Sequence, residues 1–216
     1  MEVDYSDGSL WFDDDPGPLT IRRNWKKDIL DQLLARTVYC YCECMNPLGM
    51  ENYDIPDDKI TASSYKVAVD GPRLPEYGRL RHASTWVSDQ GDHPIWIQVD
   101  LDAVLIVTGV LTQGRRASAD FKHCVDEFKV KTGLAVSSLS YIQDNTGGVK
   151  TFTTHCTDNH VRIVTSVFPS RARAQFVRIE PTICYTNFLI KDNCILRFEL
   201  LGCKNPGNNS TNITCF

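Results

Sequence analysis

The segment Ile95–Arg116, IWIQVDLDAVLIVTGVLTQGRR, decides the fold of this chain. From Ile95 to Leu101, apolar residues alternate with Trp, Gln and Asp, which is the period of a strand with one buried face. Asp102-Ala103 breaks this run. The next stretch, Val104–Leu111, is almost continuously apolar and β-branched, as is typical of a strand covered on both faces. The segment ends with a cation, Arg115, after a glycine turn. We interpret the two strands as the core of a β-sandwich and the turn as part of its functional edge.

Length and composition favour one sizeable domain with extensions. The chain has 216 residues, and 42% of them are hydrophobic, which is enough for a single core. Its net charge is −4, but residues 1–15 hold six acids and no base, so the rest of the chain carries 23 bases against 21 acids. Because no long basic stripe is present, nucleic acid is not an expected partner.

The cysteines and the C-terminal tail favour the secretory pathway. Nine cysteines are many for a reduced cytosolic protein of this length. Three acceptor triplets for N-glycosylation crowd the polar tail 204–216, at Asn208, Asn209 and Asn212. Residues 1–10 contain no apolar signal-peptide core, and no run reaches about 18 apolar residues. We expect a secreted protein whose signal peptide has been removed or is missing from this sequence.

The N-terminal region divides into two parts. Residues 1–18 are acidic and end in Asp-Pro-Gly-Pro, a composition that predicts disorder. Within 19–43, apolar residues recur every four positions from Ile21 to Leu33, which predicts a short amphipathic helix before a Cys-rich linker. Three roles stay open for this helix: packing on its own domain, binding a partner or another copy, and lying on a membrane surface.

The remainder of the chain predicts short strands separated by turns. We expect strands near Val125–Thr132, Leu139–Gln143, Lys150–Thr153, Val161–Val167, Ala174–Pro181 and Cys194–Gly202. The Asp144–Gly148 stretch, DNTGG, has the residues of a hairpin turn, and Lys66–His82 is broken by Pro and Gly and predicts a long loop. No helical period longer than two turns interrupts the series. The pattern therefore predicts an all-β chain, an antiparallel sandwich or jelly roll.

Five motifs in this order resemble the discoidin, or F5/8 type C, domain family. They are CMNPLGMENYDIPDDKITASS from Cys44, WIQVDL from Trp96, VTGVLTQGR from Val107, FVRIEPT from Phe176 and CILRFELLGC from Cys194. The resemblance covers about Cys44–Cys203, three-quarters of the chain. It implies an eight-stranded antiparallel jelly-roll β-sandwich over 44–203. It also implies an extracellular binding module for anionic phospholipid, carbohydrate or protein, which uses the loops at one end of the sandwich.

The family's three ligand-facing loops correspond here to Tyr65–Arg81, Ser88–Pro94 and Gly114–Lys122. Arg115 matches the family's arginine at the base of the third loop, where it is either a salt-bridged structural residue or a contact to an anionic ligand. The tip of the first loop, Val67–Pro72, has no Trp or Phe and contains an acid. Its insertion into lipid would contribute only about 1–3 kcal/mol, so membrane insertion is not expected.

The cations of these loops are the candidate ligand-binding residues. They are Arg73, Arg79, Arg81, Arg115, Arg116 and Lys122. Guanidinium and ammonium groups suit sulfated or sialylated glycans and acidic protein patches, so we expect a cell-surface or matrix glycan or protein as the partner. The alternative is a solvated basic rim with no binding role.

Six cysteines are expected to pair within the domain. The resemblance implies that Cys44 and Cys203 join its first and last strands, which would remove unfolded-chain entropy worth about 5 kcal/mol. Cys184 and Cys194 flank one loop between two strands that could be neighbours, and a bridge between them is expected. Cys124 and Cys156 remain as a second possible internal pair.

Three cysteines lie outside the sandwich: Cys40, Cys42 and Cys215. Their positions are comparable to those of the flanking cysteines through which a secreted member of the family is assembled by disulfides, so we expect a disulfide-linked homo-oligomer. The competing arrangement is an internal bridge from Cys215 to Cys40 or Cys42 that leaves one free thiol. An architectural matrix protein held together by such bonds is the alternative function.

The sequence contains no catalytic or metal-binding motif. The five histidines are scattered, and His-Glu-x-x-His, Gly-x-Ser-x-Gly, P-loop and Gly-x-Gly-x-x-Gly patterns are absent. The Cys-x-Cys-x-Cys run at 40–44 lacks the Cys-x-x-Cys spacing of a zinc site, so crosslinking is favoured there over metal. His155 and His160 beside Cys156 are interpreted as surface imidazoles. We therefore expect no enzyme, no metal and no cofactor.

Overall fold

The computed structural model describes residues 44–89, 91, 93–118, 121–155, 161–186, 189–190 and 193–203, without the side chains of 116–118, 121–122, 186 and 189–190. Several predicted features lie outside this part of the chain: the N-terminal helix, Cys40, Cys42, Cys156, Cys215, and the acceptor residues Asn208, Asn209 and Asn212.

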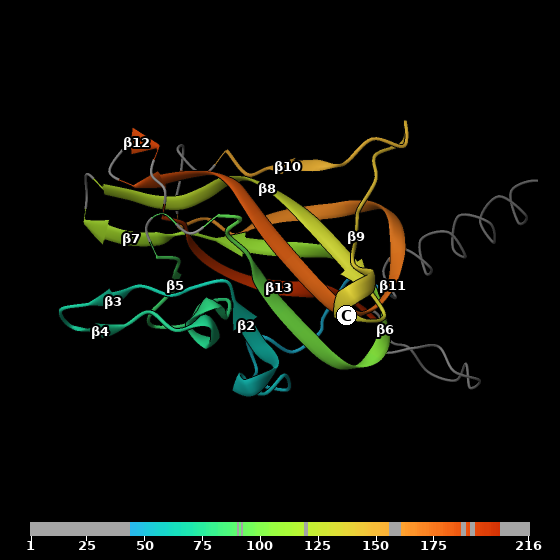
Figure 1. Cartoon of the computed structure of the whole chain (residues 1–216), viewed down its shortest axis with the longest axis horizontal. Helices are drawn as coiled ribbons and strands as arrows, with labels where there is room; N and C mark the ends of the chain where they lie inside the picture. Colours follow the sequence, from blue (N-terminus) through green and yellow to red (C-terminus); the bar gives the residue numbers. More distant parts are fainter. Residues whose placement is uncertain are drawn as a thin grey trace, which may run out of the picture. The chain divides into compact units, whose positions relative to one another are not determined.

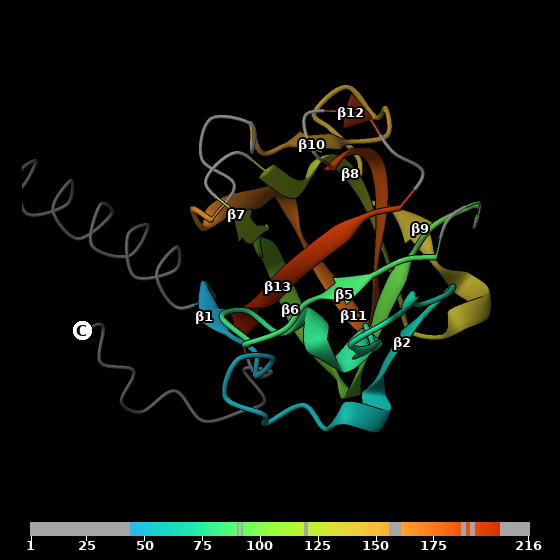
Figure 2. The ribbon, with the colours of Figure 1, turned by 90° about the vertical axis from the view of Figure 1, so that its left-hand side faces the viewer.

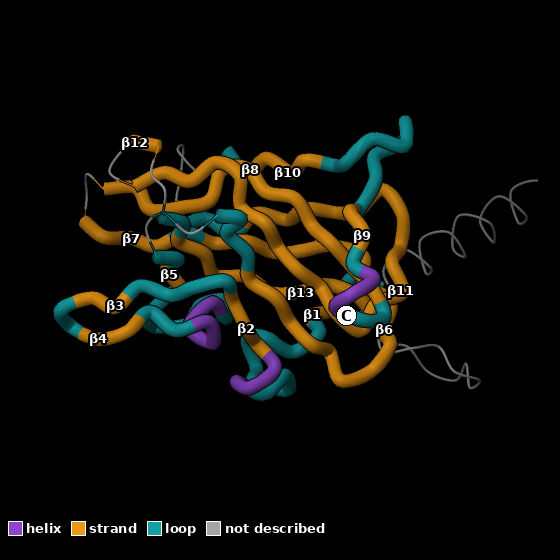
Figure 3. Tube along the Cα trace, in the orientation of Figure 1, coloured by secondary structure: helices purple, strands orange, loops and turns teal. Residues whose placement is uncertain are grey.

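The described residues are mostly β-strand, and their only helices are short 3₁₀ turns (Figures 1 and 3). The strands are β1 (Asn46–Pro47), β2 (Ile60–Ala62), β3 (Val67–Ala68), β4 (Gly71–Pro72), β5 (Trp86–Val87), β6 (Ile97–Gln113), β7 (Arg115–Ser118), β8 (Phe121–Gly133), β9 (Ser140–Tyr141), β10 (Thr151–Thr153), β11 (Val164–Thr186), β12 (Leu189–Ile190) and β13 (Ile195–Cys203). The 3₁₀ turns are η1 (Asp57–Lys59), η2 (Pro75–Gly78) and η3 (Val136–Ser138). The all-β prediction is confirmed.

Two long strands, β6 and β11, take part in both layers of the sandwich (Figure 2). The first half of β6 pairs with β2 and with the 176–179 stretch of β11, whereas its second half pairs with β13 and with the 164–174 stretch. The second half of β11 also pairs with β8, and β8 pairs in turn with β7, β9 and β10. All of these pairings are antiparallel. Because the two halves of each long strand pair with different strands, each long strand bends from one layer into the other.

The expected break at Asp102-Ala103 is a bend within one strand rather than a gap between two. β6 runs without interruption through Asp102, whose φ of 61° turns the chain sharply. The two strands expected over Val161–Val167 and Ala174–Pro181 are likewise one strand, β11, with register shifts between its halves. Sequence periodicity therefore located both halves of each long strand but interpreted the bend within it as a strand end.

The core lies between the layers. Ile97 and Val99 are fully buried on the inner face of β6, as the alternation predicted. Gln98, on the opposite face, is also only 7% exposed, because the Arg178 side chain covers it and donates from Nε to its Oε1 at 3.0 Å. The same guanidinium lies 4.2 Å from the centre of the Trp96 ring, so the outward face of this strand is itself packed.

Disulfides close both ends of the last strand. Cys44 and Cys203 are bonded, with their Cα atoms 4.5 Å apart, and this bond brings the two ends of the domain together as the resemblance implied. Cys184 and Cys194 are bonded at the opposite end of β13, with Cα atoms 5.2 Å apart. Cys124 is also disulfide-bonded, while its expected partner Cys156 lies outside the described residues.

Candidate functional site: the three-loop end

The three predicted loops meet at one end of the sandwich, which we call the three-loop end. The first loop contains the β3–β4 hairpin and η2, and the third contains β7 and the start of β8 (Figure 1). The second loop, Ser88–Pro94, is anchored to the Cys184–Cys194 disulfide, because Ser88 N–H donates to the Cys194 carbonyl at 3.0 Å and Cys194 N–H donates to Ser88 Oγ at 2.8 Å. A backbone bond from Lys66 N–H to the Val87 carbonyl ties the first loop to the start of the second.

The β3–β4 hairpin carries an ion pair and two exposed valines. Arg73 donates to both carboxylate oxygens of Asp70, at 2.6 and 2.5 Å, and its side chain is only 14% exposed. The hydrogen bond from Arg73 holds the pKa of the Asp70 carboxyl below its usual range, and the nearby charge of Arg115 contributes. Val67 and Val69 project into solvent, and Val69 is the more exposed of the two. Arg73 is therefore already paired, while two exposed valines lie beside the ion pair.

Arg115, from β7, is partly exposed and makes no ion pair within 4 Å in the described part of the chain. Its charge affects the pKa values of two other residues. It helps to lower the pKa of Asp70 on one side, and it contributes to a lowered pKa of Arg197 on the other. The charge of Arg115 thus affects both the hairpin carboxylate and a second arginine.

Arg197 is the site residue that sequence reasoning missed. It lies in β13, where its guanidinium donates to the His82 carbonyl at 2.8 Å and to the Gly114 carbonyl at 2.5 Å. Its Nε is buried and contacts no acceptor among the described residues. Burial lowers the pKa of Arg197, and repulsion by Arg115 adds to that effect. The side chain ties the first loop to the third, but it is held by neutral groups alone.

A small hollow lies at the end of β6. Thr112, Gly114 and Arg162 contribute to its lining. The Thr112 hydroxyl is buried and contacts no partner within the described residues. The three-loop end therefore presents donors both on its surface and just below it.

Arg79, one of the predicted ligand-binding residues, lies in the interior instead. Its side chain is 1% exposed, donates from Nη1 to the Met50 carbonyl at 2.8 Å, and pairs with Asp57 through Nη2. Its guanidinium also lies 4.5 Å from the centre of the Tyr53 ring. Because these partners occupy the guanidinium, Arg79 holds the first loop in place, and we leave it out of the proposed site.

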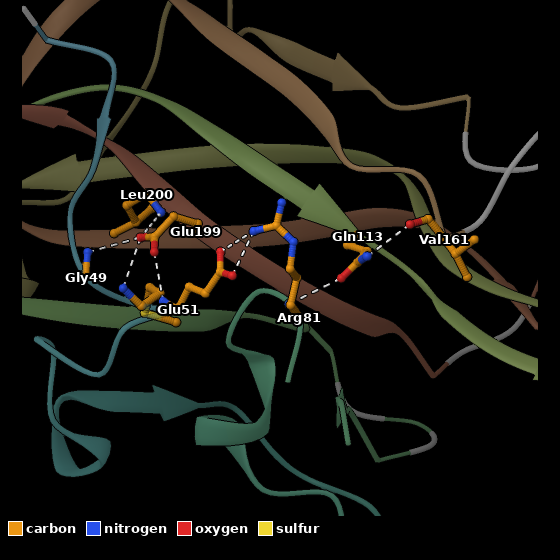
Figure 4. A network of polar contacts seen from close by, with 8 residues as sticks. Gly49, Glu51, Arg81, Gln113, Val161, Glu199 and Leu200 are labelled. Carbon is orange, nitrogen blue, oxygen red and sulfur yellow. Dashed lines mark hydrogen bonds and ion pairs between the residues drawn. The ribbon is translucent and has the colours of Figure 1, made fainter. Parts of the chain in front are cut away.

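Arg81 belongs to a polar network that runs along one side of the domain (Figure 4). Its Nη1 contacts both carboxylate oxygens of Glu51, at 2.7 and 2.6 Å, and its N–H donates to Gln113 Oε1 at 3.3 Å. Gln113 Nε2 in turn donates to the Val161 carbonyl at 3.0 Å. Arg81 is 58% exposed, so its charge is paired but remains accessible.

Glu199 anchors the other end of that network. Its carboxylate is fully buried in β13 and accepts hydrogen bonds from the backbone N–H groups of Gly49, Met50, Glu51 and Leu200, at 2.8 to 3.3 Å. Four donors compensate a charge that would otherwise be costly to bury. This bonding fixes the turn from which Glu51 reaches Arg81.

The remaining predicted cations lie in the third loop. Arg116 and Lys122 are opposite each other in the β7–β8 pairing, and Arg115 is opposite His123. The side chains of Arg116 and Lys122 lie outside the described residues. Within the described ranges, no three His, Cys, Asp or Glu side chains gather as a metal site, and no helix there is long and apolar enough to span a membrane.

Comparisons with known proteins agree on one family. The model of the F5/8 type C domain matches residues 59–200. Lactadherin from Mus musculus is 32% identical over 169 residues, which cover 76% of this chain and 35% of lactadherin. Neuropilin-1 from Homo sapiens is 32% identical over 165 residues, which cover 75% of this chain and 16% of neuropilin-1. The chain thus spans about a third of the length of lactadherin and less of neuropilin-1.

Solved structures share the fold at low sequence identity. Discoidin II of Dictyostelium discoideum aligns with a TM-score of 0.53 and 18% identity, over 70% of this chain and 57% of discoidin II. The CBM32 module of AlyQ, solved in complex with 4,5-unsaturated mannuronic acid, aligns with a TM-score of 0.50 and 17% identity, over 68% of this chain and 95% of the module. These alignments establish the jelly-roll fold.

Proposed function

Because the chain belongs to the F5/8 type C domain family, we propose that it is an extracellular module that binds an anionic group of a cell-surface or matrix glycan or protein at its three-loop end. Domains of this family are binding modules rather than enzymes. The disulfides within the domain are consistent with an oxidising, extracellular environment.

The observation that supports an anionic ligand most strongly concerns the ion pairs of this end. Some of its arginines are paired with a carboxylate and others are not. Arg73 forms an ion pair with Asp70, and Arg81 forms one with Glu51. Arg115 and Arg197 make no ion pair with any described carboxylate. Two neighbouring cations without a counterion repel each other and attract an anion. A carboxylate or sulfate between them would relieve the repulsion and supply an acceptor.

A glycan array on the whole chain tests the proposal. Sugar acids belong on it, because one structural neighbour holds 4,5-unsaturated mannuronic acid, which carries a carboxylate. We expect saturable binding to anionic glycans, and the Arg115→Glu change to weaken it by about 30-fold or more, since the loss of a charge pair that the bound ligand shields from water costs about 2 kcal/mol or more. Arg173→Glu is the matched control, because Arg173 is exposed beside Ile106 at the Cys203 end.

Two results would contradict this function. One is saturable anionic binding that Arg115→Glu and Arg173→Glu affect equally, which would place the site elsewhere. The other is an array without hits while the protein forms covalent oligomers, which is the result expected of an architectural matrix protein.

An anionic phospholipid surface is a second candidate, and the exposed hairpin tip favours it. Val67 is 74% exposed, and Val69 in the same hairpin is fully exposed. Complete burial of two valines in lipid would contribute about 3–6 kcal/mol, more than the sequence alone suggested. Sedimentation with phosphatidylserine and phosphatidylcholine vesicles separates the candidates. A lipid site predicts loss of phosphatidylserine binding in Val67→Ser/Val69→Ser, whereas a glycan site predicts array hits that this variant retains.

We also propose a covalent homo-oligomer formed through Cys40, Cys42 and Cys215. The Cys44–Cys203 bond supports it, because both ends of the domain leave from one place. Cys40 is four residues from Cys44, so an extended chain keeps it within about 14 Å of that bond. A ladder on a non-reducing gel that disappears after reduction, and in the triple Cys→Ser variant, is the expected result. A monomer with one titratable thiol would support the internal bridge instead.

A further inference from the structure

Thr112 carries a buried hydroxyl that has no hydrogen-bond partner in the described part of the chain. Its side chain is 3% exposed and lies at the end of β6. The register of the strands explains the missing partner, because Thr112 is opposite Val164 in β11 and Phe198 in β13, and neither of these side chains has a polar atom. A buried hydroxyl without a partner is costly, so its presence needs a reason.

Other buried threonines of the domain show how such a hydroxyl is satisfied. Thr85, Thr108 and Thr154 each donate a hydrogen bond to a backbone carbonyl. Thr108 even belongs to the same strand as Thr112 and lies four residues before it. The unpaired hydroxyl of Thr112 is therefore particular to its position at the end of β6, and is not a general property of buried threonine in this domain.

The hollow at the end of β6 is where a partner for this hydroxyl can enter. Its lining includes Thr112 and the cation Arg162, and its apolar walls are Val125, Val164 and Leu196. The hollow is partly open to solvent, and its enclosed part has room for about one water-sized group. Arg162 is exposed and makes no ion pair within the described residues. The hollow therefore suits a small polar group that belongs to an anionic ligand.

Gly114 connects the hollow to the proposed anion site. It lines the hollow, its carbonyl accepts a hydrogen bond from Arg197 at 2.5 Å, and Arg115 follows it in the chain. Consecutive Cα atoms are about 3.8 Å apart, so those of Thr112 and Arg115 are at most about 11 Å apart. The long arginine side chain covers part of this distance. A ligand of one or two sugar rings can therefore contact both residues.

We propose that the hollow is a hydroxyl-binding subsite of the three-loop end, where the Thr112 hydroxyl bonds a hydroxyl of the ligand while Arg115 holds the ligand's anionic group. This inference rests on the proposed function, because both groups belong to one ligand. A hydroxyl both donates and accepts, so it matches the Thr112 hydroxyl in either orientation. A carboxylate in the same place would lose its hydration against the apolar walls, at a greater cost than a neutral hydroxyl. The subsite therefore selects acidic sugars over acidic peptides.

The Thr112→Val change tests the subsite, because it removes the hydroxyl and keeps the branched shape of the side chain. The probes are glucuronate and cyclohexanecarboxylate, two ring carboxylates of which only the first carries hydroxyl groups. NMR titration of the full chain measures both affinities. We expect the wild-type protein to bind glucuronate more tightly than cyclohexanecarboxylate. Thr112→Val should weaken glucuronate binding by about 3- to 10-fold, the contribution of one hydrogen bond, and should not change the affinity for cyclohexanecarboxylate.

Thr108→Val is the matched control, because it makes the same change in the same strand at a hydroxyl that already donates to the Cys44 carbonyl. It should leave both affinities unchanged and lower the melting temperature. Thr112→Val should not lower the melting temperature, because it removes no hydrogen bond of the described fold. An equal fall in the two variants would mean that the Thr112 hydroxyl has a structural partner, and would overturn the proposal.

The possible outcomes separate this inference from the proposed function. Equal affinities of the wild-type protein for the two probes, or glucuronate binding that Thr112→Val leaves unchanged, would overturn the hydroxyl subsite and indicate that only water enters the hollow. If Arg115→Glu still abolished binding in that case, the anion site of the proposed function would stand. Binding of neither probe to the wild-type protein would contradict the proposed function and this inference together.

Discussion

The buried charges around Glu199 and those around Arg197 belong to the same strand, β13, but they are satisfied differently. Glu199 accepts from four backbone N–H groups, and nearby Arg79 is held by Asp57 and the Met50 carbonyl. Arg197 has two neutral carbonyls, a buried Nε without an acceptor among the described residues, and Arg115 as a repelling neighbour. Charges with fixed partners stabilise the fold, whereas we propose that the incompletely compensated charges at the loop end hold the ligand. The predictions below compare the three-loop end with the rest of the domain, first for stability and then for these charges.

Removal of the disulfides should have the largest effect on stability. The Cys44–Cys203 bond joins residues that are 159 positions apart in the sequence, and the Cys184–Cys194 bond joins residues that are 10 positions apart. The loop-entropy model gives about 5 kcal/mol for the first and about 3 kcal/mol for the second. Urea unfolding of the Cys44→Ser/Cys203→Ser and Cys184→Ser/Cys194→Ser variants measures both. A larger loss at the three-loop end would show that this end, and not the Cys44–Cys203 end, holds the domain together.

Glu199→Gln should destabilise the domain more than any other single substitution proposed for it. The amide keeps one acceptor but directs two donors towards backbone N–H groups that need an acceptor. We expect a loss of about 2–4 kcal/mol in the free energy of unfolding. Glu51→Gln is the matched control, because it removes only an exposed ion pair with Arg81, worth at most about 1 kcal/mol. Equal losses in the two variants would mean that the buried carboxylate has no special role.

Arg79→Met and Arg115→Met separate a structural arginine from a binding one. Arg79→Met leaves the buried Met50 carbonyl without its donor, so we expect a loss of about 1–3 kcal/mol in stability. Its glycan affinity, measured on the fraction that remains folded, should be unchanged. Arg115→Met should change stability by no more than about 0.5 kcal/mol and should reduce glycan affinity. The opposite pattern would exchange the roles that we assign to these two residues.

The smallest expected effect is electrostatic and concerns Asp70. Its carboxyl has a lowered pKa, so the stabilisation that it provides is present above its ordinary value of 3.8 and is lost as the pH falls through the lowered pKa. NMR titration of the Asp70 carboxyl should give a midpoint below 3.8. Arg73→Gln should raise that midpoint, and Arg115→Gln should raise it by less, because Arg73 bonds the carboxylate directly. A larger shift in Arg115→Gln would place Arg115 in the ion pair.

Local sequence patterns predicted most of the fold, because the spacing of apolar residues reflects which residues are buried. The alternation around Ile97 and Val99 identified the buried face, and the loop between Cys184 and Cys194 pointed to their bond. The patterns could not distinguish a bend from a strand end at Asp102, because a positive φ at one residue does not change the spacing of apolar residues in the sequence. Family resemblance supplied the Cys44–Cys203 pair, because residues 159 apart have no local signal in common.

The site was only partly predictable, because burial and pairing of a loop arginine depend on distant residues. Arg79 and Arg81 are two positions apart in the predicted loop, yet one is 1% exposed and the other is 58% exposed. The difference arises from Asp57 and Tyr53, which lie in another part of the sequence. Arg197 had one available signal: it alternates with apolar residues and with Glu199 in a strand that is otherwise buried.

The most direct test of the central claim follows the arginine side chains during ligand binding. NMR signals of the arginine Nε–H groups can be recorded while a sialylated trisaccharide or a sulfated disaccharide is added. We predict that the signals of Arg115 and Arg197 shift together with one saturation curve, and that the signal of Arg79 stays unchanged. Shifts at Arg79, or saturable binding with no shift at Arg115 and Arg197, would contradict the claim that the unpaired arginines of the three-loop end hold the ligand.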